Sequence, residues 1–346
     1  MKKVYLTLLA GLFLSACQQK QSEIQTNHYV ATNNFYDNEA VKTLPLATLS
    51  IDGEIANPGL VDFTKLPKRS VIVKEASLNV DGTNKFIGAY RYDGYSLFDI
   101  LNSIKLQKKN KDEFSPIIDL YVEISNDNGD KVIFSWGELY YPNNLHKIII
   151  ADEVMRIVPS KTKELWPLPE FSRLVVATDL ITERNISNPS KITVRSAGAT
   201  FKVQKGMSPM YSESFKLKSE DGKEVMMKEI SSKLQAVTYN AIFYGRGKGI
   251  HSTSPFTGYL LKEVLAPYYK ESKENIQRGL FIMAGQDGYR VAITYAELFN
   301  RNDQSDFLLT ENRKDNEGGR FKVYPASDFF SDRAVKSLTE ILFEKR

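Results

Sequence analysis

Glycine alternates with charged residues in one segment, residues 244–251, whose sequence is YGRGKGIH. Such glycines allow backbone amides to converge, and Arg246, Lys248 and His251 add positive charge or hydrogen-bond donors beside Gly247. We therefore predict that this segment binds a phosphate, a carboxylate or another anion. The spacing is not that of a Walker motif, and a flexible hairpin loop with a solvated basic tip is the alternative interpretation.

A second candidate segment, residues 88–93, is aromatic, with the sequence GAYRYD. Tyr90 and Tyr92 are placed to stack on a flat ligand with Arg91 beside them. Packing of the two tyrosines at the edge of a sheet is the alternative interpretation. Together the two segments predict a small anionic or aromatic ligand.

The other reactive side chains form no recognisable catalytic or metal-binding pattern. The three histidines, His28, His146 and His251, do not lie at metal-ligand spacing. A Gly-x-Ser-x-Gly motif is absent from the sequence. Cys17 is the only cysteine, which excludes disulfides, thiolate clusters and a cysteine nucleophile in the folded body. The formal charge of +4 is too small to indicate a nucleic-acid partner.

The N-terminus carries a signal for export. Two lysines precede an apolar run, residues 4–14, which suits a signal peptide and is too short to span a bilayer. The run ends in LSAC at residues 14–17, which is similar to a bacterial lipobox. We expect residues 1–16 to be removed and Cys17 to be acylated, so that lipid anchors the protein in the cell envelope. A secretory signal with an incidental cysteine is the alternative interpretation.

The residue after the cysteine bears on the choice of membrane. Gln18 is not the aspartate that retains some lipoproteins at the inner membrane, which favours the outer membrane if the cell is Gram-negative. The anchor is followed by a polar stretch rich in Gln and Asn, so residues 17–43 are predicted to be the anchor and a flexible tether.

The composition of the body is that of a globular protein, with 42% hydrophobic and 25% charged residues. Short β-type runs bounded by Asn, Asp, Gly or Pro predict strands, and one run at helical spacing, Ser96–Ile104, predicts a helix capped by its serine. We interpret the pattern as α+β. The predicted strands are Leu49–Ile55, Val71–Val73, Tyr121–Ile124, Val132–Phe134, Ile148–Ile150, Leu174–Val176 and Ile192–Val194.

Three blocks of sequence recur in the same order in the two halves of the chain. They pair Gly94–Leu101 with Gly258–Leu265, Gly129–Leu139 with Gly288–Leu298, and Asp179–Ile192 with Asp328–Ile341. Such self-similarity predicts two homologous modules, at residues 44–200 and 201–346. Trp136 and Tyr295 occupy matched positions and are predicted to be packing residues.

With these blocks in view, both modules resemble the molybdopterin-binding domain of the sulfite oxidase family. Residues 333–341 (RAVKSLTEI), preceded by Val-Tyr-Pro at 323–325, resemble the closing segment of that family. The two GYxL octets and the Asp-Gly-Tyr at 287–289 resemble its helix start and a hairpin. The resemblance covers most of residues 49–346. It implies two tandem mixed-sheet modules of the sulfite oxidase molybdopterin-binding type.

The chain departs from that family at the metal. Active members bind molybdenum through a cysteine thiolate, but the corresponding segments, residues 71–87 and 237–252, contain no cysteine. The signal also lacks the arginine pair that export of a cofactor-loaded enzyme requires. We expect a cofactor-free binding or accessory lipoprotein. The alternatives are a molybdopterin-dependent oxidoreductase with a non-cysteine ligand (Ser77, Tyr239 or His251) and a structural subunit of an envelope complex.

Overall fold

Short strands are the main regular structure of the protein in its computed structural model, which describes residues 39–247, 249–253, 255–313 and 318–346. Strands account for 41% and helices for 11%, and four small sheets are arranged like the blades of a four-bladed β-propeller. The predicted α+β class is therefore wrong. So is the molybdopterin-binding fold of the sulfite oxidase type that the resemblance implied.

The physical reason lies in the two Leu-rich octets. The resemblance gave each the role of a helix start, and such a helix would have to cover a sheet. Instead the first three residues of each octet extend a strand, and the other five form short helices, Leu97–Leu101 and Leu261–Leu265. A helix of one and a half turns covers little apolar surface.

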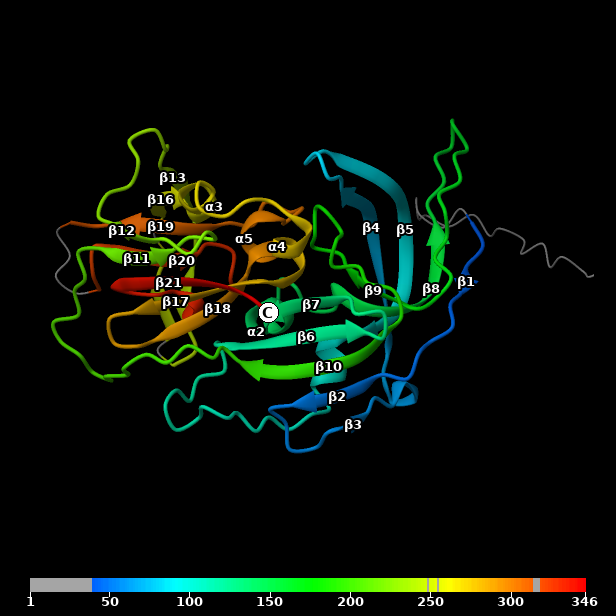
Figure 1. Ribbon diagram of the computed structural model, residues 1–346, viewed down its shortest axis with the longest axis horizontal. Coiled ribbons are helices and arrows are strands. Elements are labelled where there is room, and N and C mark those ends of the chain that lie inside the picture. Colours follow the sequence, from blue (N-terminus) through cyan, green and yellow to red (C-terminus); the bar gives the residue numbers. More distant parts are fainter. Residues whose placement is uncertain (1–38, 248, 254, 314–317) are drawn as a thin grey trace, which may run out of the picture. The chain divides into compact units, whose positions relative to one another are not determined.

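The elements run in chain order from a short strand at Lys42 to a long strand at the C-terminus (Figure 1). Up to residue 200 they are β1 (Lys42–Thr43), β2 (Ser50–Gly53), β3 (Gly59–Leu60), η1 (Phe63–Lys65), β4 (Lys68–Leu78), β5 (Asn84–Ser96), α1 (Leu97–Leu101), β6 (Leu120–Asn126), β7 (Lys131–Ser135), α2 (Trp136–Tyr140), β8 (Ile148–Arg156), β9 (Arg173–Val176) and β10 (Pro189–Ser196).

The second part of the chain contains the following elements. They are β11 (Phe215–Lys218), β12 (Glu224–Met227), β13 (Val237–Tyr239), β14 (Phe243–Gly245), β15 (Gly249–Ser252), β16 (Phe256–Leu260), α3 (Leu261–Leu265), α4 (Lys273–Arg278), β17 (Gly279–Gly285), β18 (Arg290–Thr294), α5 (Tyr295–Phe299), β19 (Phe307–Glu311), β20 (Phe321–Pro325), η2 (Ser331–Arg333) and β21 (Leu338–Lys345).

Two of the four sheets share one strand order. The sheet β3-β2-β10-β6-β7 corresponds to the sheet β12-β11-β21-β17-β18. Each contains one parallel pair, which is β2 with β10 in the first sheet and β11 with β21 in the second. The other two sheets are β1-β8-β5-β4, with β9 on β8, and β13-β16-β19-β20. The β14–β15 hairpin forms a two-stranded sheet of its own.

Most local predictions are confirmed. Each predicted strand overlaps an observed one, and the predicted helix is α1, whose Ser96 hydroxyl accepts a hydrogen bond from the Asp99 amide at 3.1 Å. The three recurring blocks lie on corresponding elements. The first block is a strand and a helix, β5–α1 in one half and β16–α3 in the other, and the second is a turn, a strand and a helix, ending in β7–α2 and β18–α5. The third is the segment that leads into β10 or β21. The module boundaries themselves remain a prediction.

The two hairpins β6–β7 and β17–β18 pack on each other. β18 is buried along its whole length and β7 nearly so. The reason is a small apolar cluster in which each hairpin covers the other; it contains Tyr121, Ile133, Leu280 and Ala292. Trp136 and Tyr295 are buried as predicted, although each begins a helix rather than lying in a strand.

The predicted signal peptide, Cys17 and residues 17–38 of the predicted tether lie outside the described residues. Within the described part, no helix combines the length and the apolar character needed to cross a bilayer.

Candidate functional site

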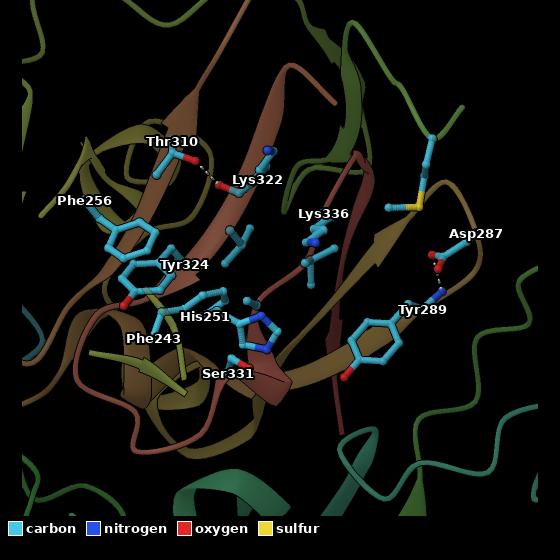
Figure 2. A pocket seen from close by; sticks show the side chains of 14 residues that line it. Phe243, His251, Phe256, Asp287, Tyr289, Thr310, Lys322, Tyr324, Ser331 and Lys336 are labelled. Atoms are coloured by element: carbon cyan, nitrogen blue, oxygen red, sulfur yellow. Dashed lines mark hydrogen bonds between the residues drawn. The ribbon is translucent and has the colours of Figure 1, made fainter. Parts of the chain in front are cut away.

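A cavity of about 390 Å³ lies against the β14–β15 hairpin (Figure 2). Its walls come from five further places in the fold: Met210 before β11, the start of β16, the turn between β17 and β18, the strand pair β19–β20, and residues 331–336 that lead into β21. Ligand cavities in proteins commonly measure about 300 to 1,000 Å³. This cavity is therefore large enough for a small organic molecule.

Three aromatic rings form one wall of the cavity. Phe256 and Tyr324 stack with their ring centroids 3.9 Å apart and an interplanar angle of 13°. The Phe243 ring packs against both, at 5.5 Å from Phe256 and 5.2 Å from Tyr324. Figure 2 shows these rings on one side and Tyr289 on the other, with His251 between them. Such a wall offers flat apolar surface to a planar ligand.

The remaining lining mixes apolar and polar side chains, and its charged groups are more positive than negative. Lys322 and Lys336 supply the cations, and Asp287 is the acid in the lining. The Asp287 carboxylate accepts a hydrogen bond from the Tyr289 amide at 3.0 Å, which closes the turn before β18. Ser331 and Thr310 add hydroxyl groups. An anionic group on the ligand therefore matches the charge of this cavity.

Tyr289 forms the far wall and is held in place by its hydroxyl. The hydroxyl donates a hydrogen bond to the Asp332 carbonyl oxygen at 2.6 Å. Burial raises the pKa of Tyr289 well above its ordinary value of 10.0. The ring therefore stays neutral and does not oppose an anion.

The predicted glycine-rich segment forms the β14–β15 hairpin, with Gly249 at a φ of +79° in its turn. Gly245 is required for the shape of the cavity, because a Cβ there would lie 2.4 Å from Nε2 of His251 and 3.2 Å from Oγ of Ser331. The His251 ring fills this space and packs on Phe243, with ring centroids 5.4 Å apart. Of the predicted ligand residues, His251 is thus brought to the cavity.

The other predicted residues of this segment do not line the cavity. Nε of Arg246 lies 2.8 Å from Oδ2 of Asp332, and its guanidinium lies 5.8 Å from the centroid of the Phe330 ring. Gly247 is exposed at the tip, and Lys248 lies outside the described residues. Arg246 therefore holds the hairpin against the η2 segment.

No family model and no curated protein matches this chain.

The second predicted segment, with Tyr90, Arg91 and Tyr92, lies in β5 and is not brought to this cavity. Both tyrosines are buried, and their ring centroids are 5.5 Å apart. The Tyr90 hydroxyl donates to the Pro167 carbonyl at 2.7 Å, and burial raises its pKa to about 12. Arg91 pairs with Asp93 at 3.2 Å. In this structure the two rings are packed in the core of their sheet.

The aromatic wall and the lysines were missed by sequence reasoning. Phe243, Phe256, Tyr324, Lys322 and Lys336 come from segments that are separated along the chain and carry no local motif. They are brought together by the pairing of β16 with β19, of β19 with β20 and of β20 with the segment before β21, and by the packing of the Phe243 ring on Phe256 and Tyr324. Residues 323–325 and 336 were noted as part of the closing segment, but not as ligand contacts.

Buried arginines fix the segments beside the cavity. Arg333 is 2% exposed and makes two hydrogen bonds of 2.7 Å to Asp328, and a third to Glu297. Because Arg333 lies inside residues 331–336, this network sets the position of the cavity wall. Arg184 does the same in the first half of the chain, with bonds of 2.6 to 3.1 Å to Asp179 and Glu138.

The Arg184 network and the Arg333 network are in direct side-chain contact. Thr294 donates a hydrogen bond to Glu138 at 3.1 Å, and Nη1 of Arg333 lies 3.5 Å from Oγ of Ser135. Burial raises the pKa of Glu138 to about 7, and the nearby charge of Glu297 acts in the same direction. Burial also acts to raise the pKa of Glu297, but the Arg333 guanidinium outweighs it and the pKa is lowered.

The side chains considered as alternative molybdenum ligands lie apart. His251 lines the cavity described above, Ser77 lines a different one, and the Tyr239 hydroxyl donates to Asp306 at 2.9 Å. In the part of the chain that the structure describes, no group of three or more His, Cys, Asp or Glu residues is placed to hold a metal ion.

Proposed function

We propose that this chain is a lipid-anchored binding protein and that the cavity beside the β14–β15 hairpin holds a small aromatic anion. The observation that carries the proposal is the pairing, in one cavity, of a wall of three aromatic rings with two lysines. Rings give affinity for a planar apolar body, and lysines favour an acidic group on it.

The lipid anchor in this proposal rests on the sequence. The apolar run at residues 4–14 and the LSAC that follows it support acylation of Cys17. Several acyl chains bind a membrane firmly, since each buried methylene contributes about 0.8 kcal/mol. The polar residues after Cys17 then allow the folded body to stand away from the bilayer.

Three probes separate the two features of the expected ligand. 2-Naphthoate is both aromatic and anionic, 2-naphthylmethanol lacks the charge, and cyclohexanecarboxylate lacks the aromatic ring. Isothermal titration of the full chain in detergent should give one site for 2-naphthoate, with a dissociation constant at least tenfold lower than that for either other probe. Equal affinity for all three, or no binding of 2-naphthoate, would overturn the proposal.

Variants of the lining connect binding to this cavity. Phe256→Ala and Lys336→Gln should each weaken binding of 2-naphthoate at least fivefold. Lys85→Gln is the matched control, because Lys85 is an exposed lysine on β5 and does not line the cavity. Thermal unfolding of each variant distinguishes lost binding from lost folding. Unchanged affinity in both folded variants would place the probe elsewhere.

A further inference from the structure

A second cavity, of about 210 Å³, lies at the corresponding place in the first half of the chain. The correspondence follows from the backbone: the Leu174 amide bonds to the Ile186 carbonyl at 2.9 Å, as the Val323 amide bonds to the Val335 carbonyl at 2.9 Å. This register matches Arg173 with Lys322. Each of the two strands thus carries, within its first two residues, a cation that lines a cavity.

The lining of the second cavity is polar and has charges of both signs. Arg173 and Lys273 are the cations, and Asp130 and Glu183 are the acids. Nζ of Lys273 lies 3.4 Å from Oε2 of Glu183, whose other oxygen accepts a hydrogen bond from the Leu78 amide at 2.8 Å. The wall also contains the side chains of Ser77, Asn185, Ser187 and Gln277. Lys273 and Gln277 come from α4, so both halves of the chain build this cavity.

Not all of the N–H groups of Arg173 are bound by its partner within the chain, the Glu75 carboxylate. Its Nη2 lies 3.4 Å from Oε2 of Glu75, which is a long contact. Its Nε is buried, and no described residue accepts a hydrogen bond from it. The Glu75 carboxylate is meanwhile bound by the Tyr92 hydroxyl at 3.1 Å and by Nδ2 of Asn185 at 2.9 Å. A buried N–H without an acceptor is unfavourable. The Arg173 side chain is 22% exposed and lines the cavity, so its guanidinium is available to a ligand carboxylate.

We propose that this second cavity binds a small zwitterion of the size and charge of a free α-amino acid. The carboxylate of the ligand accepts hydrogen bonds from Arg173, and its ammonium group lies toward Asp130 and Glu183. The volume is below that of cavities for larger organic ligands. The acids Asp130, Glu183 and Glu75 outnumber the cations Arg173 and Lys273. A simple anion would add to this excess of negative charge, whereas a zwitterion adds no net charge and interacts with both signs.

This proposal is independent of the aromatic-anion site, because the two cavities share no lining residue. Either ligand can therefore bind without the other. Loss of one site leaves the other measurable in the same preparation.

The test is isothermal titration of the full chain in detergent with each of the common L-amino acids in turn. At least one should bind with a stoichiometry of one. For the tightest, the N-acetyl derivative, which lacks the ammonium group, and the amide derivative, which lacks the carboxylate, should each bind at least tenfold more weakly. Binding of no amino acid would overturn the proposal, as would equal binding of the N-acetyl derivative or of inorganic phosphate.

Variants assign the site. Arg173→Gln should weaken amino-acid binding at least tenfold, while Lys322→Gln, the matched change in the first cavity, should leave it unchanged. Because Arg173→Gln also removes a partner of buried Glu75, Lys273→Glu serves as a second variant. The Lys273 side chain is 61% exposed, so the fold tolerates the change. It removes the cation beside Glu183 and adds a negative charge where the ammonium group of the ligand lies, so it should strengthen binding at least threefold. Unchanged affinity in both variants would contradict the assignment.

Discussion

The two cavities occupy corresponding places in the fold and differ in what lines them. In the cavity beside the β14–β15 hairpin, β20 contributes Lys322 and Tyr324, and the tyrosine stacks in the aromatic wall. In the other, β9 contributes Arg173, but Val175, which matches Tyr324, is fully buried in the core of its sheet. The shared backbone thus places a cavity and a basic side chain at the same position in both halves. The neighbouring side chains determine the kind of ligand.

The segments that follow show the same divergence. Ala334 and Val335 give one cavity an apolar floor, whereas Asn185 faces the other with its amide engaged by Glu75. Arg333 directly precedes Ala334, and Arg184 directly precedes Asn185. Both arginines are buried, and each has two acidic partners. Residues that fix the backbone are therefore matched. Of the residues that face the cavities, the cations Arg173 and Lys322 and the apolar Ile186 and Val335 are matched, but the aromatic wall of one cavity has no equivalent in the other.

The largest expected effect comes from the matched arginines. Arg333→Met and Arg184→Met each leave two buried carboxylates without their cation, and should lower the free energy of unfolding by about 3 to 5 kcal/mol. Urea unfolding measures this loss. Arg333→Met should also abolish 2-naphthoate binding, since Arg333 fixes the wall of that cavity. A loss below about 1 kcal/mol in either variant would show that the networks do not fix these segments.

The next effect distinguishes the two buried glutamates by pH. The pKa of Glu138 is about 7 in the folded protein and 4.5 in the unfolded chain. Between these two pH values the folded protein keeps a proton that the unfolded chain has released. Stability should therefore fall as pH rises from about 5 to 8, by about 3 kcal/mol, and Glu138→Gln should flatten this slope.

Glu297→Gln is the matched control for this experiment. Arg333 lowers the pKa of Glu297 in the folded protein. The stability that ionised Glu297 contributes is therefore complete above its pKa in the unfolded chain, and it is lost only as the pH falls through its lower pKa in the folded protein. Glu297→Gln should therefore leave the slope between pH 5 and 8 intact. Equal slopes in wild type and Glu138→Gln would contradict the difference between the two networks.

A smaller effect is expected at the hairpin glycines. Gly245→Ala places a Cβ 2.4 Å from Nε2 of His251 and should displace that ring, weakening 2-naphthoate binding about threefold to tenfold. Gly247→Ala is the control, since its Cβ meets nothing within 4 Å. Titration of both variants decides whether the His251 ring contributes to the cavity. Amino-acid binding at the second cavity should be unchanged in both.

The smallest effect on either cavity is expected from Cys17→Ser. This change should move the protein from the membrane fraction to the soluble fraction and prevent incorporation of labelled palmitate, with both ligand affinities within a factor of two of wild type. Palmitate labelling of the Cys17→Ser variant would place the acyl group on another residue.

Local structure was more predictable from the sequence than the site was. The alternation and turn residues of short strands predicted β2 and β6 to β10, and Ser96 predicted the start of α1. The α+β class was wrong because Leu spacing over an octet does not show where a strand ends and a helix begins. His251 was predicted as a ligand residue from its neighbouring glycines. Tyr324 and Arg173 were not, because their roles depend on strands that pair across the chain.

The most direct test of the aromatic-anion site is a crystal structure of the protein grown with 2-naphthoate. We expect electron density for the naphthalene ring against Phe256 and Tyr324, with its carboxylate directed toward Lys322 and Lys336. Density for the probe only outside this cavity, or in the cavity beside Arg173, would contradict the proposed function.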